Sequence, residues 1–309
     1  MKSKIYVIGS SNTDMVVKSN FLPKPGETVI GDTFLMNPGG KGANQAVSAC
    51  KLGADVTFIT KVGNDMFGKK AVNNFKKIGI KTDYIRIDKN NSSGVAIIMV
   101  DKSGENSISV APGANNSLTI KDVNFIEEKL KADDYVLIQL EIPKTVVEYL
   151  IEICNKLKVK LILNPAPFQK ISDYHLSQVN TITPNEIETE YLSGIKVKDK
   201  ETAKKASEIL INKGIKNIII TMGEKGAFYK SSSFEGLIPT KKVSVIDSTA
   251  AGDTFNGALV AGLSMKMDML TSIDFANNAA TYSVTKLGAQ SSAPSLNDLN
   301  NKFLKYVHS

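Results

Sequence analysis

The chain has 309 residues, of which 42% are hydrophobic and 22% are charged, a balance that is ordinary for a globular protein. Its net charge is +7, but the lysines are scattered over helical patterns and Arg86 is the only arginine in the sequence. Because base readout and bidentate phosphate contacts usually use arginine, the composition argues against nucleic-acid binding. No segment approaches the ~20 apolar residues that a membrane-spanning helix needs, so we expect no membrane partner.

The first residues, MKSKIYVIGS, predict a β-strand over 4–9. Their apolar run is too short for an export signal and has no cleavage-site pattern. Cys50 and Cys154 lie far apart in helical patterns. We therefore expect free thiols and a cytoplasmic protein, because disulfides are rare in a reducing compartment.

Strand and helix patterns alternate along most of the chain. The candidate strands are residues 4–9, 55–63, 83–87, 135–140, 160–164, 181–183 and 217–221. Several of them are continuous apolar runs, as expected for strands that are buried on both faces of a parallel sheet. Helix patterns lie between them at 119–131, 145–156 and 202–213, the first with Thr119 and Asp122 at capping positions. The alternation predicts a three-layer αβα, Rossmann-like fold with a mostly parallel sheet, in a single domain over residues 1–309.

Two segments interrupt this alternation. Residues 12–37 contain the turn LPKPG and no helix pattern, and residues 94–110 read as a hairpin around the turn DKSGEN. We expect both segments to form one small extra sheet. A β flap of this kind often covers a site as a lid, although an insertion without a function is the plainer alternative.

Polar residues follow two of the candidate strands in the first half of the chain. SSNTD, residues 10–14, comes after the first strand, and Glu141 comes after the strand 135–140. Ligands of open α/β sheets bind beyond the carboxyl ends of the strands. Asn12 and Asp14 could bind adjacent hydroxyls of a polyol, but they could also form an Asx turn that leads into the lid.

A glycine-rich turn, PGGKGANQAV, occupies residues 38–47 and enters a predicted helix. Gly39, Gly40 and Gly42 permit unusual backbone angles and close approach of a ligand. Lys41 and Asn44 add polar groups within the same turn. The combination predicts a binding loop rather than a plain turn.

Two common nucleotide motifs are absent. GNDMFGKK, residues 63–70, matches the spacing GxxxxGK, but Lys70 stands where a Walker loop needs serine or threonine to hold Mg²⁺. The first strand is followed by IGSSNTD and not by the dinucleotide fingerprint GxGxxG. The second absence argues against a dehydrogenase.

Two polar turns follow strands in the second half of the chain. In NEIE, residues 185–188, Asn185 and Glu188 could organise water around Mg²⁺, which keeps several waters in proteins. Ordinary helix capping is the alternative for these two residues. TMGEKG, residues 221–226, ends a strand with two glycines and is a candidate loop for nucleotide phosphates.

The stretch DSTAAGDTF, residues 247–255, is a turn between a predicted short β segment at 243–246 and a helix that begins near Asp253. The first N–H groups of a helix have no internal partner and lie at the positive end of the helix dipole. Small side chains here would let an anion reach those groups. Asp253 itself could be only a favourable acid in the first turn, so the motif alone does not make it catalytic.

Together these motifs resemble the PfkB family of ribokinase-like carbohydrate kinases. The resemblance runs from IGSSNTD through PGGKGANQA, TPNEIE, TMGEKG and DSTAAGDTFNGA to KLGAQSSAP. It implies the family's fold with a small β-sheet lid, and transfer of the γ-phosphoryl group of ATP to a sugar hydroxymethyl. The expected acceptor is the 5-hydroxyl of D-ribose. A kinase for 2-deoxyribose or fructose, and a non-catalytic sugar-binding regulator, remain as alternatives.

The resemblance implies roles for individual residues. Asp253 corresponds to the catalytic base, and the N–H groups of Ala250, Ala251 and Gly252 to an anion hole. The positions that match sugar contacts are Asn12, Thr13, Asp14, Gly40, Lys41, Gly42, Asn44, Glu141 and Asp253. The positions that match the ATP side are Asn185, Thr221, Gly223, Glu224, Lys225, Gly226, Gly252 and Asn277. The resemblance leads us to expect His at position 277 in some relatives, where this chain has Asn.

The resemblance also implies metal ions. Glu188 corresponds to an acid that orders Mg²⁺ through water. An activating K⁺ ion is expected near the anion hole, with the candidate ligands Asp247, Thr249, Ser283, Lys286, Gly288 and Ser292. Finally, we expect a homodimer that forms through the lid sheet, because its outer face is predicted to be apolar, with Val29, Ile30, Phe34, Ile97 and Met99.

Overall fold

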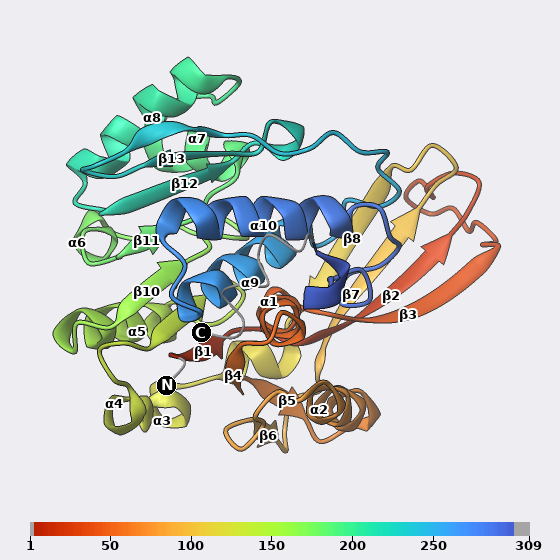
Figure 1. Ribbon diagram of the computed structural model, residues 1–309. Coiled ribbons are helices and arrows are strands. Elements are labelled where there is room, and N and C mark those ends of the chain that lie inside the picture. Colours follow the sequence, from red (N-terminus) through yellow and green to blue (C-terminus); the bar gives the residue numbers. More distant parts are fainter. Residues whose placement is uncertain (1–2, 300–309) are drawn as a thin grey trace.

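A large, mostly parallel sheet forms the centre of the computed structural model, which describes residues 3–299 (Figure 1). Within these residues the sheet has eight strands in the order β14 (Glu235–Ile238), β13 (Ala227–Lys230), β12 (Asn217–Thr221), β11 (Thr181–Ile182), β10 (Lys160–Leu163), β9 (Tyr135–Ile138), β1 (Lys4–Ile8) and β4 (Asp55–Ile59). The six strands from β12 to β4 are parallel to one another, whereas β13 is antiparallel to both β12 and β14.

Helices cover both faces of this sheet, so the molecule has the three layers that the sequence predicts. The helices α1 (Lys41–Lys51), α2 (Met66–Ile78), α9 (Ala251–Ser264) and α10 (Met269–Ser283) pack on one face. The helices α3 (Ile120–Val123), α4 (Ile126–Lys129), α5 (Lys144–Lys156), α6 (Asp173–Leu176), α7 (Glu186–Ser193) and α8 (Lys200–Asn212) pack on the other.

Strand β1 shows why its apolar run has no polar alternation. Ile5 and Val7 point into the core beneath α1 and α9, whereas Tyr6 and Ile8 point into the core on the opposite face. All four side chains are buried. A strand with core on both sides needs apolar residues at every position, and this confirms the parallel-sheet interpretation.

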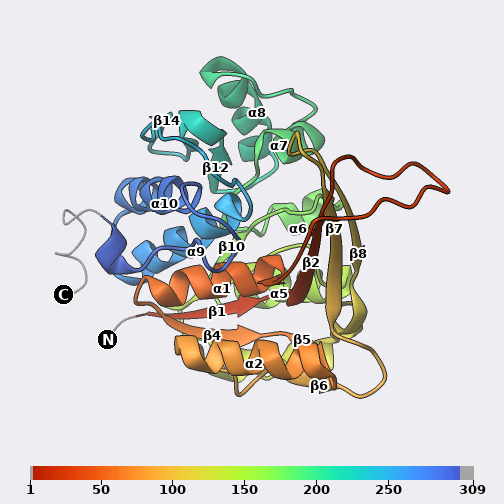
Figure 2. The ribbon, with the colours of Figure 1, turned by 90° about the vertical axis from the view of Figure 1, so that its right-hand side faces the viewer.

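The small extra sheet is also present. Its strands are β2 (Asn12–Lys18), β3 (Thr33–Gly39), β7 (Gly94–Val100) and β8 (Asn106–Ala111), in the order β3-β2-β7-β8. Figure 2 shows it standing beside the main domain, beyond the end toward which β1 points. The segment between β2 and β3 projects outward as a long loop (Figure 2). The predicted flap is therefore a separate sheet at the carboxyl ends of the central strands.

Two predicted strands take a different place in the structure. The run 55–63 divides into β4 and β5 (Lys61–Gly63), and the run 83–87 contributes only to β6 (Arg86–Asp88). β5 and β6 pair with each other outside the main sheet. The side chain of Ser93 accepts the N–H of Gly63, and so ties β5 to the base of the lid. The apolar sequence of residues 55–63 does not indicate that β5 leaves the main sheet and pairs with β6.

Residues 119–131 form two short helices and not the single predicted helix. The predicted capping box at Thr119 and Asp122 is present and starts α3. Beyond it the N–H groups of Glu127 and Glu128 bond to the carbonyls of Asn124 and Phe125, three residues back. This tighter pattern interrupts the α-helix between α3 and α4.

The predicted β segment at 243–246 is wrong. These residues have exposed side chains and belong to no strand, although the N–H of Ile246 bonds to the carbonyl of Val284. Conversely, the antiparallel edge strands β13 and β14 were not predicted. Short 3₁₀ turns occur at Gly113–Ser117, Gly223–Lys225 and Leu296–Asp298.

Cys50 and Cys154 are both free thiols, as expected. In the part of the chain that the structure describes, no helix combines the length and the apolar character needed to span a membrane.

Candidate active site

Two adjoining cavities lie where the predicted motifs meet. The larger has a volume of about 480 Å³ and the smaller about 210 Å³. Their walls share Asn185, Thr221, Ser248, Ala251 and Gly252. The start of α9 therefore separates a large chamber from a small one, and a ligand that spans both would pass this helix end.

The start of α9 is an uncapped helix end. Ala250 precedes it in the left-handed conformation, with φ 58°, and no side chain caps the helix. The N–H of Ala251 turns back to the carbonyl of Ser248 at 3.2 Å. A side chain added at Gly252 would meet no atom within 4 Å, so the helix end is open toward the cavities.

Asp253 lies in the first turn of α9 and is buried, with 7% of its surface exposed. Its Oδ2 accepts the side-chain amide of Asn44 at 3.0 Å, and its Oδ1 accepts that of Gln45 at 2.9 Å. Burial raises the pKa of the carboxyl, while Lys41 and the two amides oppose this rise. The result is a carboxylate held in a fixed orientation and made more basic than usual.

The turn before α1 packs directly on the end of β1. Gly40 has φ +89°, and a side chain there would lie 2.7 Å from the backbone nitrogen of Asn12. A side chain at Gly42 would lie 2.6 Å from the backbone of Gly9. These glycines are required by close backbone approach, and they bring Lys41 to the wall of the smaller cavity.

Lys41 is surrounded by carboxyl groups. The pKa of its ammonium is raised mainly by Asp253, with burial opposing, and then by Glu141, Glu188 and Asp14. The backbone N–H of Lys41 also donates to the Glu141 carboxylate at 3.1 Å. One cation is thus shared by four acids from α9, β2, α7 and the loop after β9.

The lid contributes Asn12 and Asp14 through strand β2. The side chain of Asn12 accepts the amide of Asn115 at 2.7 Å, which fixes its orientation. Burial, together with Glu141 and Asp253, raises the pKa of Asp14 to about 6. A side chain at Gly39 would lie 2.2 Å from the Asp14 carboxylate, so the lid strand β3 leaves space for this group.

Asn185 and Glu188 form a complete capping box at the start of α7, which was the plainer reading of this pair. The Glu188 carboxylate accepts the backbone N–H of Asn185 at 2.9 Å and its side-chain amide at 3.1 Å. Both residues also line the smaller cavity. Burial raises the pKa of Glu188. The capping box therefore does not exclude the predicted role of these two residues in ordering water around Mg²⁺.

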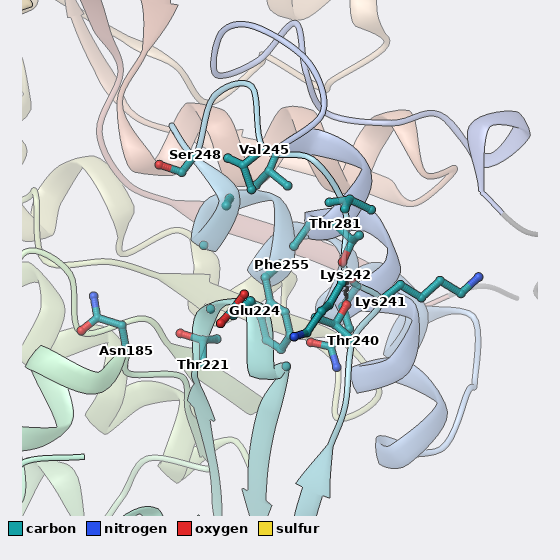
Figure 3. Close-up of a pocket in the computed structure, with 18 of the residues that line it drawn as sticks. Asn185, Thr221, Glu224, Thr240, Lys241, Lys242, Val245, Ser248, Phe255 and Thr281 are labelled. Carbon is teal, nitrogen blue, oxygen red and sulfur yellow. Dashed lines mark hydrogen bonds between the residues drawn. The ribbon is translucent and has the colours of Figure 1, made fainter. Parts of the chain in front are cut away.

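The larger cavity contains most of the positions expected on the ATP side. Thr221, Gly223, Glu224, Gly226 and Asn277 line it, and Asn277 donates its amide to the carbonyl of Ile238 at 3.0 Å. Lys225 does not line it, because its ammonium bonds to the carbonyl of Lys198. Figure 3 shows Phe255 at the centre, with Thr221 on one side and Thr240 and Thr281 on the other.

The candidate K⁺ ligands come from two segments that lie side by side. The carboxylate of Asp247 accepts the N–H of Thr249 and the N–H of Gly288, each at 2.9 Å. Burial disfavours the charge, but these hydrogen bonds outweigh it and hold the pKa of Asp247 below its usual value. The hydroxyls of Ser283 and Ser292 are buried and bond to nearby carbonyls.

The structure adds residues to the site that the sequence did not single out. Gln45, Asn164, Thr183 and Asn256 lie around Asp253 or line the smaller cavity. Thr240, Lys241, Lys242, Val245, Phe255 and Thr281 line the larger one. Gln45 follows Asn44 in the glycine-rich turn and Asn164 ends a predicted strand, so position alone could have indicated these two.

Comparison with known proteins agrees with this arrangement. The model of the pfkB family of carbohydrate kinases matches residues 2–296. A ribokinase from Haemophilus influenzae is 44% identical over 95% of this chain and 96% of its own. A deoxyribokinase from Salmonella typhimurium is 37% identical over 96% of this chain and 97% of its own. A ribokinase structure from Arabidopsis thaliana, complexed with ribose and ATP, superimposes with a TM-score of 0.88 at 28% identity, over 100% of both chains.

Proposed function

The chain belongs to the pfkB family of carbohydrate kinases, and we propose that it transfers the γ-phosphoryl group of ATP to the 5-hydroxyl of D-ribose. The products are ribose 5-phosphate and ADP. The proposal of ribose is supported by the 44% identical ribokinase and by the ribokinase that was solved with ribose and ATP.

One observation carries the mechanism. Asp253 is a buried carboxylate with a raised pKa at the first turn of α9, beside the wall that the two cavities share. The acceptor hydroxyl loses its proton to Asp253 as its oxygen forms the new bond to the γ-phosphorus, and the bond from that phosphorus to the bridging oxygen of ADP breaks. A general base works best when its pKa lies near the working pH, and burial moves this carboxyl in that direction.

The smaller cavity and the lid would hold the sugar. Asp14 and Glu141 can accept sugar hydroxyls, and the ammonium of Lys41 can donate to a hydroxyl oxygen. Asn44 has a buried side-chain oxygen without a protein partner among the described residues. A sugar hydroxyl can satisfy that oxygen, because an unpaired buried acceptor is costly.

The open end of α9 would stabilise the transferred phosphoryl group. The N–H groups that follow Ala250 point their positive dipole at the shared wall, where negative charge builds up during transfer. Ala250, Ala251 and Gly252 have no bulky side chain to keep the phosphoryl oxygens away. Phosphoryl transfer depends mainly on positioning and on charge stabilisation of this kind.

The ATP moiety would occupy the larger cavity. Its apolar wall, with Val245 and Phe255, suits a base, while Thr221, which lines both cavities, and Gly223 would lie closer to the phosphates. The nearby amide of Asn277 is used by Ile238, so Asn277 shapes this wall through the backbone.

The oxygen donors near the site suit hard cations. Glu188, which lines the smaller cavity with Asn185, would hold Mg²⁺ through water. Asp247, whose lowered pKa keeps it charged, would hold K⁺ with Thr249 and the segment 283–292. When bound, Mg²⁺ would neutralise phosphate charge and K⁺ would add positive charge near the start of α9.

We further propose that residues 1–309 act as one cytoplasmic kinase domain whose small sheet is a lid, and that two copies join through that lid. Strand pairing supports an apolar outer face. Val17 pairs with Phe34 and Met99, and Met15 pairs with Ile97, all on the face opposite Asp14. Ile30, Phe34 and Ile97 have exposed side chains.

A coupled assay of ADP release tests the function. Wild-type protein is supplied with ATP and Mg²⁺ and with D-ribose, 2-deoxyribose, fructose or adenosine, each with and without K⁺. We expect turnover on ribose that K⁺ stimulates. A protein that binds ribose but never releases ADP would instead be the non-catalytic regulator.

A kinase for 2-deoxyribose is the second candidate, because a deoxyribokinase is 37% identical over nearly the whole chain. Asp14 does not separate the two sugars, since 2-deoxyribose keeps the 3-hydroxyl. The ratio of kcat/KM for ribose to that for 2-deoxyribose decides between them.

A further inference from the structure

Two neighbouring amides of α1 hold the carboxylate of Asp253, and the sugar-contacting set includes only one of them. Asn44 reaches Oδ2 at 3.0 Å and has a free buried oxygen for a ligand. Gln45 reaches Oδ1 at 2.9 Å and is completely buried. Gln45 therefore touches the proposed base without facing the sugar.

Every polar atom of Gln45 is engaged. Its Nε2 donates to Asp253 and also to Oδ1 of Asn164 at 3.0 Å. Its Oε1 accepts from Nε2 of Gln139 at 2.6 Å. The amide of Asn164 donates onward to the carbonyl of Thr183 at 3.1 Å. A chain of buried amides thus links the strands β9 and β10 to α9 through Gln45.

The direction of this chain is fixed at the Thr183 end. The carbonyl of Thr183 can only accept, so Asn164 must turn its nitrogen to Thr183 and its oxygen to Gln45. Gln45 must then present its nitrogen to Asn164 and Asp253. A half-turn of the Gln45 amide would set oxygen against oxygen at Asn164, whereas Gln139, whose Oε1 has no partner among the described residues, could turn with it. The hydrogen bond between Gln45 and Asn164 would be lost in a buried place, where unpaired polar atoms are costly.

We propose that Gln45 is a positioning residue for phosphoryl transfer, whose amide Asn164 locks as a donor to Asp253. The inference rests on the proposed kinase function. A free amide could turn over and accept a hydrogen bond from protonated Asp253. The locked amide can only donate, so it stabilises the ionised form of Asp253 and does not stabilise the protonated form. It therefore keeps Asp253 ready to accept the sugar proton and to release it after transfer.

Neutral substitutions at Gln45 do not change the other charged groups around Asp253. They are Lys41 of α1, Asp14 of β2, Glu141 after β9 and Glu188 of α7.

Three variants separate positioning from packing. Gln45→Met removes the donor while keeping the length of the side chain. Gln139→Met removes the hydrogen bond to the Gln45 oxygen without touching Asp253. Ser48→Ala is the matched control: the Ser48 hydroxyl donates to the carbonyl of Thr254 at 3.1 Å in the same buried interface of α1 and α9, without contacting Asp253.

The experiment measures kcat and KM for ribose across pH. For Gln45→Met we expect the acid limb of kcat to move up by about one pH unit, so that kcat falls about tenfold on the acid side of the limb and recovers at higher pH. KM for ATP and for ribose should change by less than about threefold, because neither ligand contacts Gln45. Gln139→Met should shift the limb in the same direction by less, and Ser48→Ala should not shift it.

An unmoved acid limb in Gln45→Met, or an equal shift in Ser48→Ala, overturns the proposal. If Gln45→Met does not fold, Gln45→Asn keeps the amide but draws it away from Asp253, and the same shift is expected. Carbon-13 NMR titration of the aspartate carboxyls, with the Asp253 signal identified by Asp253→Asn, gives a second readout in the protein without substrates. A wild-type protein inactive on every sugar would refute the kinase function, while this titration would still test the lock.

Discussion

One cation, Lys41, is shared by four acidic side chains of the site, and this imbalance governs the individual residues. Its ammonium interacts with Asp253, Glu141, Glu188 and Asp14. Burial raises the pKa of Asp14, Glu188 and Asp253, so the charge of one lysine does not compensate for the loss of water. Sugar hydroxyls, which donate to carboxylates, would supply part of what water no longer provides.

The role of Asp253 as base predicts a loss confined to the chemical step. Asp253→Asn keeps the shape of the side chain and an oxygen that can accept from Asn44 or Gln45. We expect kcat to fall by about 10²-fold or more, the usual scale for loss of a general base, while ribose and ATP still bind. Calorimetric titration of both ligands and steady-state kinetics measure the two effects separately. Asp133→Asn, at an exposed surface aspartate, is the control and should turn over normally.

Near-normal turnover by Asp253→Asn would remove this residue from the mechanism. Loss of ligand binding together with turnover would instead assign Asp253 to substrate positioning.

The raised pKa of Asp14 predicts that this carboxylate lowers the stability of the folded protein while it serves sugar binding. Its pKa rises from 3.8 to about 6 on folding, so between these values the folded chain binds more protons than the unfolded chain. The free energy of unfolding therefore falls as the pH rises through this window, and the penalty is complete above it. Asp14→Asn should be more stable than wild type by about 1–3 kcal/mol at about pH 7.5, and should lose this advantage near about pH 4.

Urea unfolding of both proteins at the two pH values measures this difference. The same variant should bind ribose much more weakly, because an amide is a poorer acceptor for two hydroxyls. A variant no more stable than wild type near neutral pH would mean that Asp14 is not penalised by burial.

At the scale of elements, the uncapped start of α9 offers a separate test. Gly252 lies in the first turn with space around it, so Gly252→Ala should fit and should stabilise the helix by about 0.5–1 kcal/mol. The added methyl group would project toward the wall shared by both cavities. We expect a higher melting temperature together with a clear loss of kcat/KM for ATP.

Thermal unfolding and kinetics on the same preparation measure these two effects. Ala258→Gly, within the buried part of α9, is the reverse control and should lower the melting temperature. Unchanged kinetics in Gly252→Ala would mean that phosphate does not approach this helix end.

The elements show what the sequence could and could not predict. The turns before α1 and α9 were predictable from the sequence. Close approach of two backbone segments and an open helix end require glycine or alanine, and these residues are visible in the sequence at Gly40 and Gly252. The segment 243–246 was wrongly predicted as a β segment from its alternating valines. Val243 and Val245 alternate because both line the larger cavity. Gln45 and Gln139 were not predictable as a pair, because their contact depends on how α1 lies on β9.

At the scale of the whole molecule, the layers bring the ends of distant segments to one edge. β1, β9 and β11 are parallel, so the residues that follow them, Asn12, Glu141 and Asn185, emerge on the same side of the sheet. The small sheet stands beyond that edge and adds Asp14 (Figure 2). A sheet placed there has one face toward the site, while its other face must meet water or a partner.

That second face predicts the oligomeric state. Phe34 and Ile97 lie on the face opposite Asp14 and are 58% and 44% exposed. Exposed apolar rows of this kind are uncommon on monomers and mark interaction sites. We expect wild-type protein to be a dimer by light scattering at micromolar concentration, and Phe34→Asp with Ile97→Lys to be a folded monomer.

Leu270→Lys, at an exposed residue of α10 away from the lid, is the matched control and should remain a dimer. Because Asn12 and Asp14 belong to the same small sheet, loss of the dimer should also raise KM for ribose while leaving KM for ATP nearly unchanged. A monomeric wild type would refute the interface. A dimer that survives the lid variant would show that the two copies join through another surface. A lid variant that is monomeric with an unchanged KM for ribose would show that the lid holds its shape without a partner.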